Sequence, residues 1–422
     1  MAMELHPFLE PDIRPAANWW YVVSAAGQNP TMRVGHSATY VPALQEGEHD
    51  RVFVIGGANP SQVFSEVYVL DLHTRAWDTL EAPGFRGRYE HSAFRVENHP
   101  GKIFVFGGAT QEGNLNDLQS LDVSSGAWAD VETSGEPPSP RTHRCATVVG
   151  SKVYVYSGGQ SGPDPVSDRR VHCLDTHTMS WTTLTTRGDA PKPRHGHMMI
   201  PHNNRIYLHG GMAGATFYDD LHVLDLERSA WSNVRKKRSN PPPRAAHYAV
   251  VHSDAIYMFG GMSGAGALDD AYKLNTETNT WTKLDFEGPA PANRLDFALC
   301  VVKLQVPRAS AVPAHAHGQE DDPSETSLKA REVLERELKP GSASSRDSVS
   351  DSSCVSEALF ALEADPSAQG QQPSTETSGP VGDCGKVSAP LEGNTEEVTM
   401  VLVNGGMDTE GEIFDDTLVL LL

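Results

Sequence analysis

The sequence predicts an all-β fold in which six four-stranded sheets close into a β-propeller. Three features lead to this prediction: a double glycine that recurs six times, a tryptophan at a near-constant distance after it, and short strand-like segments between them. Self-similarity at a period of about 50 residues is typical of propeller blades, which bury their faces only by stacking radially. The chain of 422 residues, 38% of them apolar, is large enough to form the core of such a ring.

The double glycines end the second strand of each expected blade. Short runs of β-branched and aromatic residues, such as 51–55 and 102–106, precede them, and such runs favour strands. Glycine suits the sharp exit from this strand because it tolerates positive φ and close backbone approach. The pairs are Gly56 and Gly57, Gly107 and Gly108, Gly158 and Gly159, Gly210 and Gly211, Gly260 and Gly261, and Gly405 and Gly406.

A tryptophan marks the fourth, outermost strand of each blade. It follows the second glycine by 20 residues in four copies and by 22 in the third. These residues are Trp77, Trp128, Trp181, Trp231 and Trp281. The sixth copy has no such tryptophan, but Trp20 lies 16 residues before His36, the spacing that also separates Trp181 from His197. We therefore expect an N-terminal strand near 19–24 to complete blade six and close the ring.

Each blade opens with an Arg-x-x-His marker. Four copies are complete: Arg33/His36, Arg88/His91, Arg194/His197 and Arg244/His247. Arg144 and Phe297 replace the histidine in the other two copies. Because the histidines recur from blade to blade, we interpret them as structural. We interpret the acidic pairs before the third strand, such as Asp219/Asp220, as caps of the preceding loop.

A long insertion interrupts the sixth copy. The predicted organisation is an N-terminal tail at 1–17, a propeller at 18–305, an insertion at 306–395 and the remainder of blade six at 396–422. Residues 305–397 contain 17 acidic and 7 basic side chains and a single aromatic, so we expect disorder. The insertion joins the first two strands of its blade, where a long loop costs little stability.

Composition excludes several classes of protein. No apolar run is long enough to span a membrane, and the first residues do not resemble a secretory signal. The five cysteines are widely spaced without a CxxC motif, which fits a reducing cytosol better than a disulfide frame or a zinc site. The net charge of −21 argues against nucleic acid as a partner.

No motif of a known enzyme class is present. The sequence contains no GxSxG elbow, P-loop, HExxH motif or EF-hand loop. We therefore expect a non-catalytic protein without catalytic residues, cofactor or metal. Ligands contributed by separate blades escape this kind of search, so a metal-dependent enzyme on the same fold stays open as an alternative.

Features found in only one copy of the repeat are the candidates for function. The basic turn 235–238 stands out in an acidic chain, and an extra aromatic precedes one of the apolar residues that lead into the acidic pairs. Aromatic and arginine side chains dominate interface energetics. We select Phe64, Phe217, Tyr218, Arg235 and Phe414 as candidate partner contacts. The alternatives are loop packing for the aromatics and a solvated turn or acidic lipid contact for the basic residues.

The recurrent glycine pair and tryptophan resemble the kelch-repeat family over about three quarters of the chain. The segments "WWYVV", "RYEHSAF", "FYDDLH" and "GGMDTEGEIFDD" are similar to the kelch-motif Rab GTPase effectors of late-endosome to trans-Golgi transport. This resemblance implies a scaffold that binds a Rab-family GTPase in its GTP form and promotes vesicle docking. It also implies a cytoplasmic protein with a peripheral endosomal membrane pool and, as further partners, a phosphoinositide kinase or another trafficking protein. The alternative is a kelch module for a different cytosolic or nuclear partner.

Overall fold

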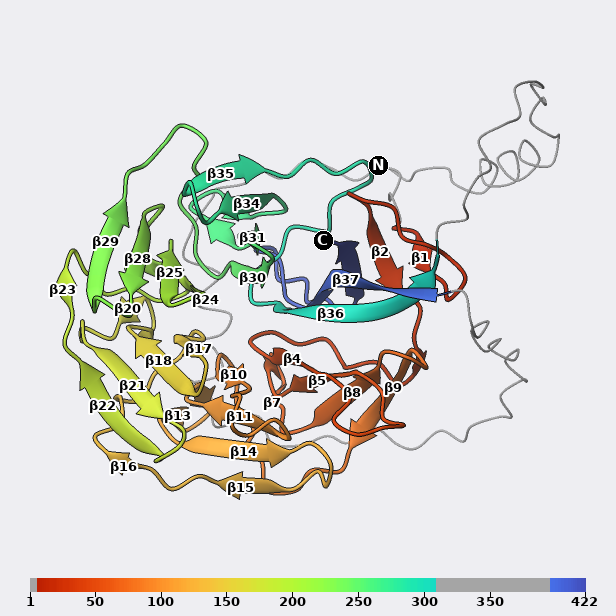
Figure 1. Cartoon of the computed structure of the whole chain (residues 1–422), viewed down its shortest axis with the longest axis horizontal. Helices are drawn as coiled ribbons and strands as arrows, with labels where there is room; N and C mark the ends of the chain where they lie inside the picture. The colour runs from red at the N-terminus through yellow and green to blue at the C-terminus, as the bar shows by residue number, and fades with distance from the viewer. Residues whose placement is uncertain (1–5, 309–394) are drawn as a thin grey trace, which may run out of the picture.

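Six sheets surround a central axis in a computed structural model that describes residues 6–308 and 395–422 (Figure 1). The described residues are all-β, without a helix, and therefore without a helix that could cross a membrane. In blades 1 to 5 the strand nearest the axis comes first along the chain, whereas in blade 6 the outermost strand comes from the N-terminal segment. The four strands of each blade pair antiparallel with their neighbours. The predicted fold class is confirmed.

The first three blades follow one another from the N-terminal half of the chain. Blade 1 consists of β4 (Ser37–Val41), β5 (Arg51–Ile55), β8 (Val67–Asp71) and β9 (Ala76–Leu80). Blade 2 consists of β10 (Ser92–Phe94), β11 (Lys102–Phe106), β14 (Leu118–Asp122) and β15 (Trp128–Asp130). Blade 3 consists of β17 (Ala146–Val149), β18 (Lys152–Tyr156), β21 (Val171–Asp175) and β22 (Ser180–Leu184).

The other three blades complete the circle. Blade 4 consists of β24 (Met198–His202), β25 (Arg205–His209), β28 (Leu221–Asp225) and β29 (Ala230–Val234). Blade 5 consists of β30 (Tyr248–His252), β31 (Ala255–Phe259), β34 (Ala271–Asn275) and β35 (Thr280–Lys283). Blade 6 consists of β36 (Ala298–Pro307), β37 (Thr395–Asn404), β38 (Thr417–Leu421) and β2 (Trp20–Val23).

The N-terminal strand closes the ring, as the tryptophan spacing predicts. Strand β2 pairs antiparallel with β38, and Trp20 lies opposite Leu420. Trp20 is 1% exposed and packs edge-on against Phe259 of blade 5, with ring centroids 5.6 Å apart. The closing strand is therefore fixed by a large apolar contact between blades as well as by its backbone ladder.

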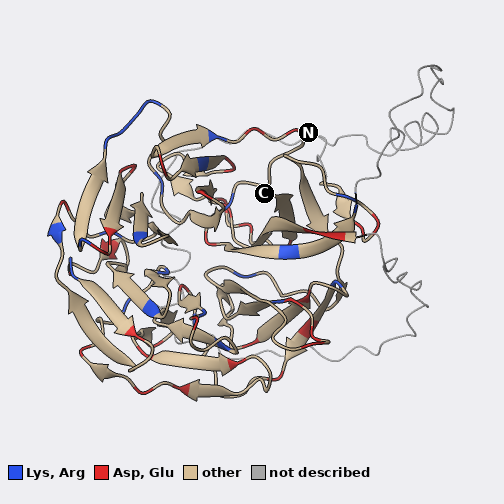
Figure 2. Cartoon of the chain, in the orientation of Figure 1, with Lys and Arg blue, Asp and Glu red and all other residues tan. Residues whose placement is uncertain are grey.

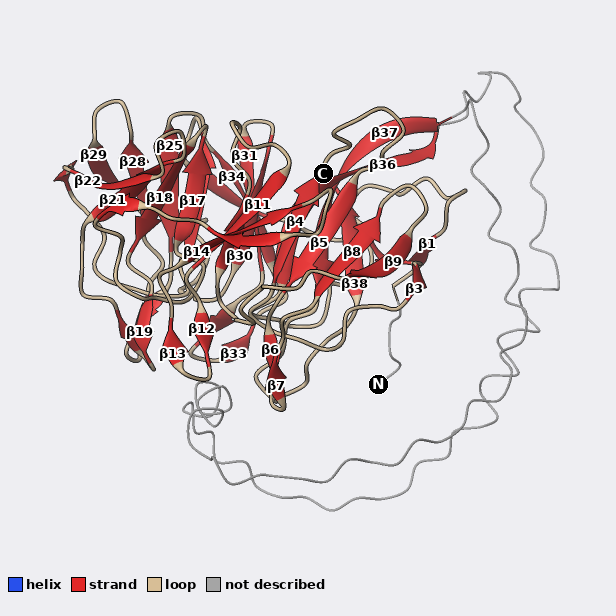
Figure 3. Cartoon of the chain, turned by 90° about the horizontal axis from the view of Figure 1, so that it is seen from below, coloured by secondary structure: helices blue, strands red, loops and turns tan. Residues whose placement is uncertain are grey.

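Short two-stranded hairpins project from one face of the ring, between the second and third strands of blades 1 to 5 (Figure 3). They are β6 (Ala58–Asn59) with β7 (Gln62–Val63), β12 (Ala109–Thr110) with β13 (Gly113–Asn114), β19 (Gly159–Ser161) with β20 (Asp164–Pro165), β26 (Met212–Ala213) with β27 (Thr216–Phe217), and β32 (Met262–Ser263) with β33 (Gly266–Ala267). The linkers that carry the Arg-x-x-His markers reach the same face. We call it the long-loop face.

Four short strands run parallel to the outermost strands. They are β1 (Phe8–Leu9) beside β2, β3 (Ala26–Gly27) beside β9, β16 (Ser134–Gly135) beside β22, and β23 (Arg187–Gly188) beside β29. Strand β1 belongs to the stretch that the sequence analysis assigns to a tail, and its Leu9 is 1% exposed.

The third copy departs from the sequence assignment by one residue. Ser157, with φ 54°, takes the place of the first glycine, and Gly158 takes the place of the second. Arg141 accordingly donates a hydrogen bond to the carbonyl of Ser157, as Arg33 does to that of Gly56. The glycine pair at 158–159 is therefore displaced, because Gly159 already belongs to the hairpin strand β19.

The expected insertion begins and ends at the tip of the β36–β37 hairpin. Pro307 lies opposite Thr395 in the ladder, so the two ends of the insertion are adjacent and join the first two strands of blade 6. Residues 309–394 lie outside the described part of the chain, and the disorder assigned to them stays a prediction.

Candidate functional site

The marker arginines anchor the loops of the long-loop face. All six are at most 4% exposed, and each donates to the carbonyl that follows the second strand of its own blade, over 2.9–3.1 Å. Four also form two-pronged ion pairs: Arg88 with Asp117, Arg194 with Asp220, Arg244 with Asp270, and Arg294 with Asp416. These acids, interpreted from sequence as loop caps, instead balance the charge of buried guanidinium groups. Such pairing is needed because an unpaired buried charge is strongly unfavourable.

The marker histidines connect neighbouring blades. His36, His91, His197 and His247 are at most 3% exposed, and burial lowers the pKa of each well below its usual value. His36 Nε2 lies 3.0 Å from Asn404 Oδ1 in blade 6, and His91 Nε2 lies 2.9 Å from Ser37 Oγ in blade 1. Within residues 6–308 and 395–422, no cluster of three or more His, Cys, Asp or Glu side chains could hold a metal ion.

The residue before each marker histidine position lines the axis. All six have positive φ, between 51° and 67°. Backbone hydrogen bonds link several of them from blade to blade: Gly35 N–H donates to the Asp296 carbonyl over 3.0 Å, and Glu90 N–H to the Gly35 carbonyl over 2.7 Å. We call this set the axial ring. It consists of Gly35, Glu90, His143, Gly196, Ala246 and Asp296.

The axial ring opens into a cavity of about 1180 Å³ on the long-loop face. Five of its six residues line the cavity, and the hairpins of blades 2 to 5 and the linker 136–140 form the walls. Apolar surface comes from Val166, Met212, Phe217, Met262 and Leu295. Carboxylates come from Glu90, Glu136, Asp168 and Asp296. A concave site with apolar walls and few convergent polar groups is suited to bind a ligand or a protruding side chain.

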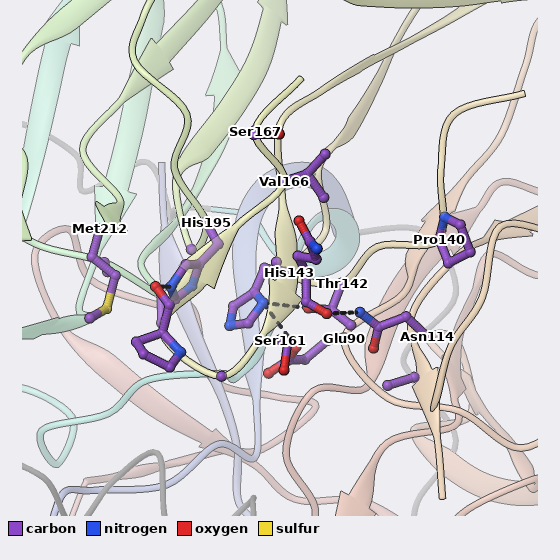
Figure 4. Close-up of a pocket in the computed structure, with 18 of the residues that line it drawn as sticks. Glu90, Asn114, Pro140, Thr142, His143, Ser161, Val166, Ser167, His195 and Met212 are labelled. Carbon is purple, nitrogen blue, oxygen red and sulfur yellow. Dashed lines mark hydrogen bonds and ion pairs between the residues drawn. The ribbon is translucent and has the colours of Figure 1, made fainter. Parts of the chain in front are cut away.

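Glu90 is the most perturbed acid of the cavity. It is 7% exposed, and burial together with the nearby charge of Asp296 raises its pKa to about 8. His143 Nδ1 lies 3.0 Å from Glu90 Oε2 and 2.6 Å from Thr142 Oγ1, the group drawn at the centre of Figure 4. Burial also lowers the pKa of His143. The raised pKa favours the protonated form of the Glu90 carboxyl at neutral pH, because burial and the charge of Asp296 both disfavour its ionisation.

Arg144 crosses the axis from blade 3. It replaces the marker histidine, and it donates to the carbonyls of Phe297 in blade 6, over 2.8 Å, and His36 in blade 1. Its guanidinium carbon lies 4.1 Å from the ring centroid of Tyr248 in blade 5. The Tyr248 hydroxyl in turn donates to Asp296 Oδ1 over 3.1 Å. From sequence this replacement is a simple departure from the repeat, whereas in the structure the arginine connects four blades beneath the cavity.

The five candidate partner contacts do not form one surface. Phe64, Tyr218 and Phe414 each lie against the marker arginine of their own blade, with guanidinium-to-ring distances of 4.1, 4.2 and 4.6 Å. Phe64 is 2% exposed and its ring is covered by the arginine that it supports, so loop packing accounts for its place in the structure; its selection as a partner contact stays a prediction. Phe217 lines the cavity. Arg235 is exposed on the linker between blades 4 and 5 and does not line the cavity.

The axial ring was missed although the sequence contains its signal. The two middle positions of Arg-x-x-His vary between copies, and a search for features unique to one copy would have found Glu90, His143 and Asp296 there. Their convergence depends on their own positive φ and on ring closure, which spacing alone does not reveal.

Comparison with known proteins agrees with this geometry. The sequence matches the KLHDC2/KLHL20/DRC7 Kelch-repeats domain over residues 43–261 and 168–306, which together span more than half of the chain. The chain belongs to the kelch-repeat family. Similarity to two mammalian proteins extends much further than the repeats. The chain is 40% identical to the mouse "Rab9 effector protein with kelch motifs" over 418 residues, which cover 99% of this chain and 97% of the mouse protein.

The rat protein of the same name is 41% identical over 418 residues, covering 99% of both chains. A more distant relative, the acyl-CoA-binding domain-containing protein 5 of Arabidopsis thaliana, is 28% identical over 223 residues, or 50% of this chain and 33% of that protein. The resemblance to kelch-motif Rab effectors is therefore confirmed. The family and these relatives support a Rab effector role and a kelch scaffold that binds other proteins.

Proposed function

We propose that this chain binds the GTP-loaded form of a Rab-family GTPase and promotes the docking of transport vesicles between late endosomes and the trans-Golgi network. The observation that carries the proposal is the 40–41% identity to two Rab9 effectors over 99% of the chain, which includes the stretch outside the kelch match. Rab9 is therefore the first GTPase to test. The scaffold acts without catalysis, by holding partners together.

The long-loop face is the proposed docking surface for the GTPase. An effector that prefers the GTP form must contact the switch segments, which the γ-phosphate orders. The irregular hairpins and linkers of this face can follow such a surface, and the cavity can accept a protruding side chain. Phe217 at its wall is the aromatic anchor that we propose, since buried aromatic residues near the centre of an interface contribute most to affinity.

The proposed location is the cytoplasm, with a peripheral endosomal pool recruited through the GTPase. A phosphoinositide kinase or another trafficking protein is the proposed further partner. Two partners can bind one ring when they use different faces or edges, which is the usual advantage of a rigid scaffold.

Retention on immobilised Rab9 tests the proposal. Full-length protein should be retained at least about tenfold better by Rab9 loaded with a GTP analogue than by the GDP form, a difference of about 1.4 kcal/mol. Equal retention in both states would overturn the effector proposal. A second Rab protein, loaded in the same two ways, serves as the control for specificity.

The docking face is tested with two phenylalanine variants. Phe217→Ala should weaken binding to GTP-loaded Rab9 about tenfold, because the ring lines the proposed interface. Phe8→Ala is the matched control, since Phe8 is 57% exposed on β1, beside the outermost strand of blade 6. A loss of binding in the control alone would move the interface away from the long-loop face.

A further inference from the structure

In four blades the linker that enters the blade covers its outermost strand. A backbone N–H of the linker donates over 2.9–3.0 Å to the carbonyl of the residue two positions before the strand tryptophan. The four bonds are Ala26 N to Arg75 O, Ser134 N to Met179 O, Arg187 N to Ser229 O, and Glu287 N to Asn18 O. Each donor is followed by a glycine: Gly27, Gly135, Gly188 or Gly288.

These glycines allow the close approach. A Cβ atom on Gly27, Gly135 or Gly188 would lie 2.2 Å from the carbonyl oxygen of the strand tryptophan. All three have φ between 79° and 86°, which disfavours any side chain. The linker can therefore cover the edge only where this position is glycine.

Blade 5 lacks this cover. Its linker has the same length between tryptophan and marker arginine as that of blade 4, but Lys237 and Arg238 stand where blade 4 has Arg187 and Gly188. The Lys237 N–H donates instead to Asn240 Oδ1 over 3.1 Å. Among the described residues, no strand pairs with the outer edge of β35. Replacement of one glycine by arginine thus coincides with an open edge strand.

The same linker carries a concentrated positive charge. Residues 235–238 are all exposed, and Figure 2 shows them as a continuous basic stretch on the linker that follows β29. Lys237 Nζ donates to the Thr278 carbonyl over 3.2 Å and to Thr280 Oγ1 over 2.7 Å, which places its charge at the start of β35. Lys236 pairs with Asp219. Arg235 and Arg238 form no ion pair within the described chain.

We propose that the outer edge of β35 binds an extended, acidic peptide segment of a partner protein as an additional strand, and that the turn 235–238 binds its carboxylates. An edge strand offers unpaired backbone groups for this mode of recognition, in which main-chain bonds supply affinity. The basic turn supplies selectivity and favours an acidic partner, although the chain as a whole carries a net charge of −21. Thr282 and Lys283 are exposed on the strand and leave room for the peptide.

Blade 2 provides an internal contrast. Its outermost strand β15 also lacks a parallel neighbour in the described structure, because its linker is two residues shorter, with 11 instead of 13 positions from Trp77 to Arg88. Phe85 stacks on Trp128 there, with ring centroids 4.4 Å apart, and the strand ends at the acidic Asp130. That edge is partly covered by an aromatic ring and repels an acidic peptide. The open edge and the basic turn coincide in blade 5.

The test measures binding of a fluorescent peptide of alternating glutamate and threonine to the full-length protein by anisotropy. The proposal requires saturable binding that weakens with added salt, and a peptide with lysine for glutamate should not bind. Arg238→Gly should weaken binding at least about tenfold, because it removes a charge and lets the linker cover the edge. Absence of binding to the acidic peptide, or unchanged affinity in this variant, would overturn the proposal.

Two controls separate strand pairing from simple charge attraction. A peptide with alternate backbone N-methylation keeps its charge but cannot pair, so it should bind at least about tenfold more weakly; equal affinity would exclude strand addition. Arg187→Glu changes a basic residue at the covered edge of blade 4 and should leave peptide affinity unchanged. Rab9 retention by Arg238→Gly should also be unchanged, so the two proposals can fail independently.

Discussion

The histidine of the Arg-x-x-His marker and the residue directly before it have different roles in this ring. Four of six copies keep the histidine, whose buried side chain contacts the preceding blade at His36, His91 and His247. The position before it belongs to the axial ring, lines the cavity in five of six copies and differs in nearly every copy. In a closed repeat, the recurrent residues therefore build the frame, while the position beside them is free to build a site.

The strongest test of this division compares two tryptophans at equivalent positions. Trp20 is 1% exposed and closes the ring, whereas Trp128 is only half-buried at the edge of blade 2. We expect Trp20→Ala to lower the free energy of unfolding by about 3–5 kcal/mol, the usual loss for a buried Trp or Phe. Trp128→Ala should cost less than half of that. Urea unfolding followed by circular dichroism gives the free energy of unfolding of both variants. Equal losses would mean that the ring-closing Trp20 stabilises the protein no more than Trp128 does.

A smaller effect is expected where the frame holds buried charge. Asp270 pairs with Arg244, which has no exposed side-chain surface, while Glu66 lies 3.7 Å from Arg33 and is 43% exposed. Asp270→Ala leaves a buried guanidinium short of its partner and should cost about 3 kcal/mol. Glu66→Ala should cost less than about 1 kcal/mol, as expected for a solvent-exposed partner. Thermal and urea unfolding of the two variants would show whether the repeated acids contribute according to burial.

The axial ring predicts a pH dependence that the frame does not. Folded Glu90, whose pKa is raised to about 8, keeps its proton over a range in which an unfolded glutamate, with a pKa near ~4.3, has lost it. The folded state then binds more protons than the unfolded state, so the free energy of unfolding falls as pH rises through this window. Between pH 6 and 8 this contribution is about 2 kcal/mol, and Glu90→Gln should remove it.

The measurement is the difference in unfolding free energy between wild type and Glu90→Gln at pH 6, 7 and 8. Glu136→Gln, at an exposed wall of the same cavity, is the control and should follow the wild type at each pH. A constant difference across the range would show that Asp296, His143 and Arg144 compensate the Glu90 charge in the folded protein.

The frame was readable from sequence because it repeats. Glycine pairs, tryptophans and the 16-residue spacing from Trp20 to His36 each recur, so the number of blades and the closing strand follow from counting. Single-copy features were harder to interpret. Phe64 looked like a contact because it is aromatic in a loop, yet a marker arginine covers it. The cavity acids come from different blades, and their separation in sequence carries no sign of their proximity in the ring.

The last prediction asks whether a departure from the repeat is neutral. Arg144→His would restore the marker in blade 3, and it should stabilise the protein if the repeat residue were the better one at this position. We expect the opposite, a loss of about 1–2 kcal/mol, since the variant removes hydrogen bonds to the Phe297 and His36 carbonyls and the contact with Tyr248. Phe297→His, the same restoration in blade 6, is the paired experiment, and it introduces a polar ring where Tyr248 packs edge-on at 5.2 Å. A gain of stability for Arg144→His would mean that Arg144 weakens the frame and is kept for function. A loss of stability would mean that Arg144 is part of the frame. It occupies the one histidine position of the marker whose side chain connects blades across the axis.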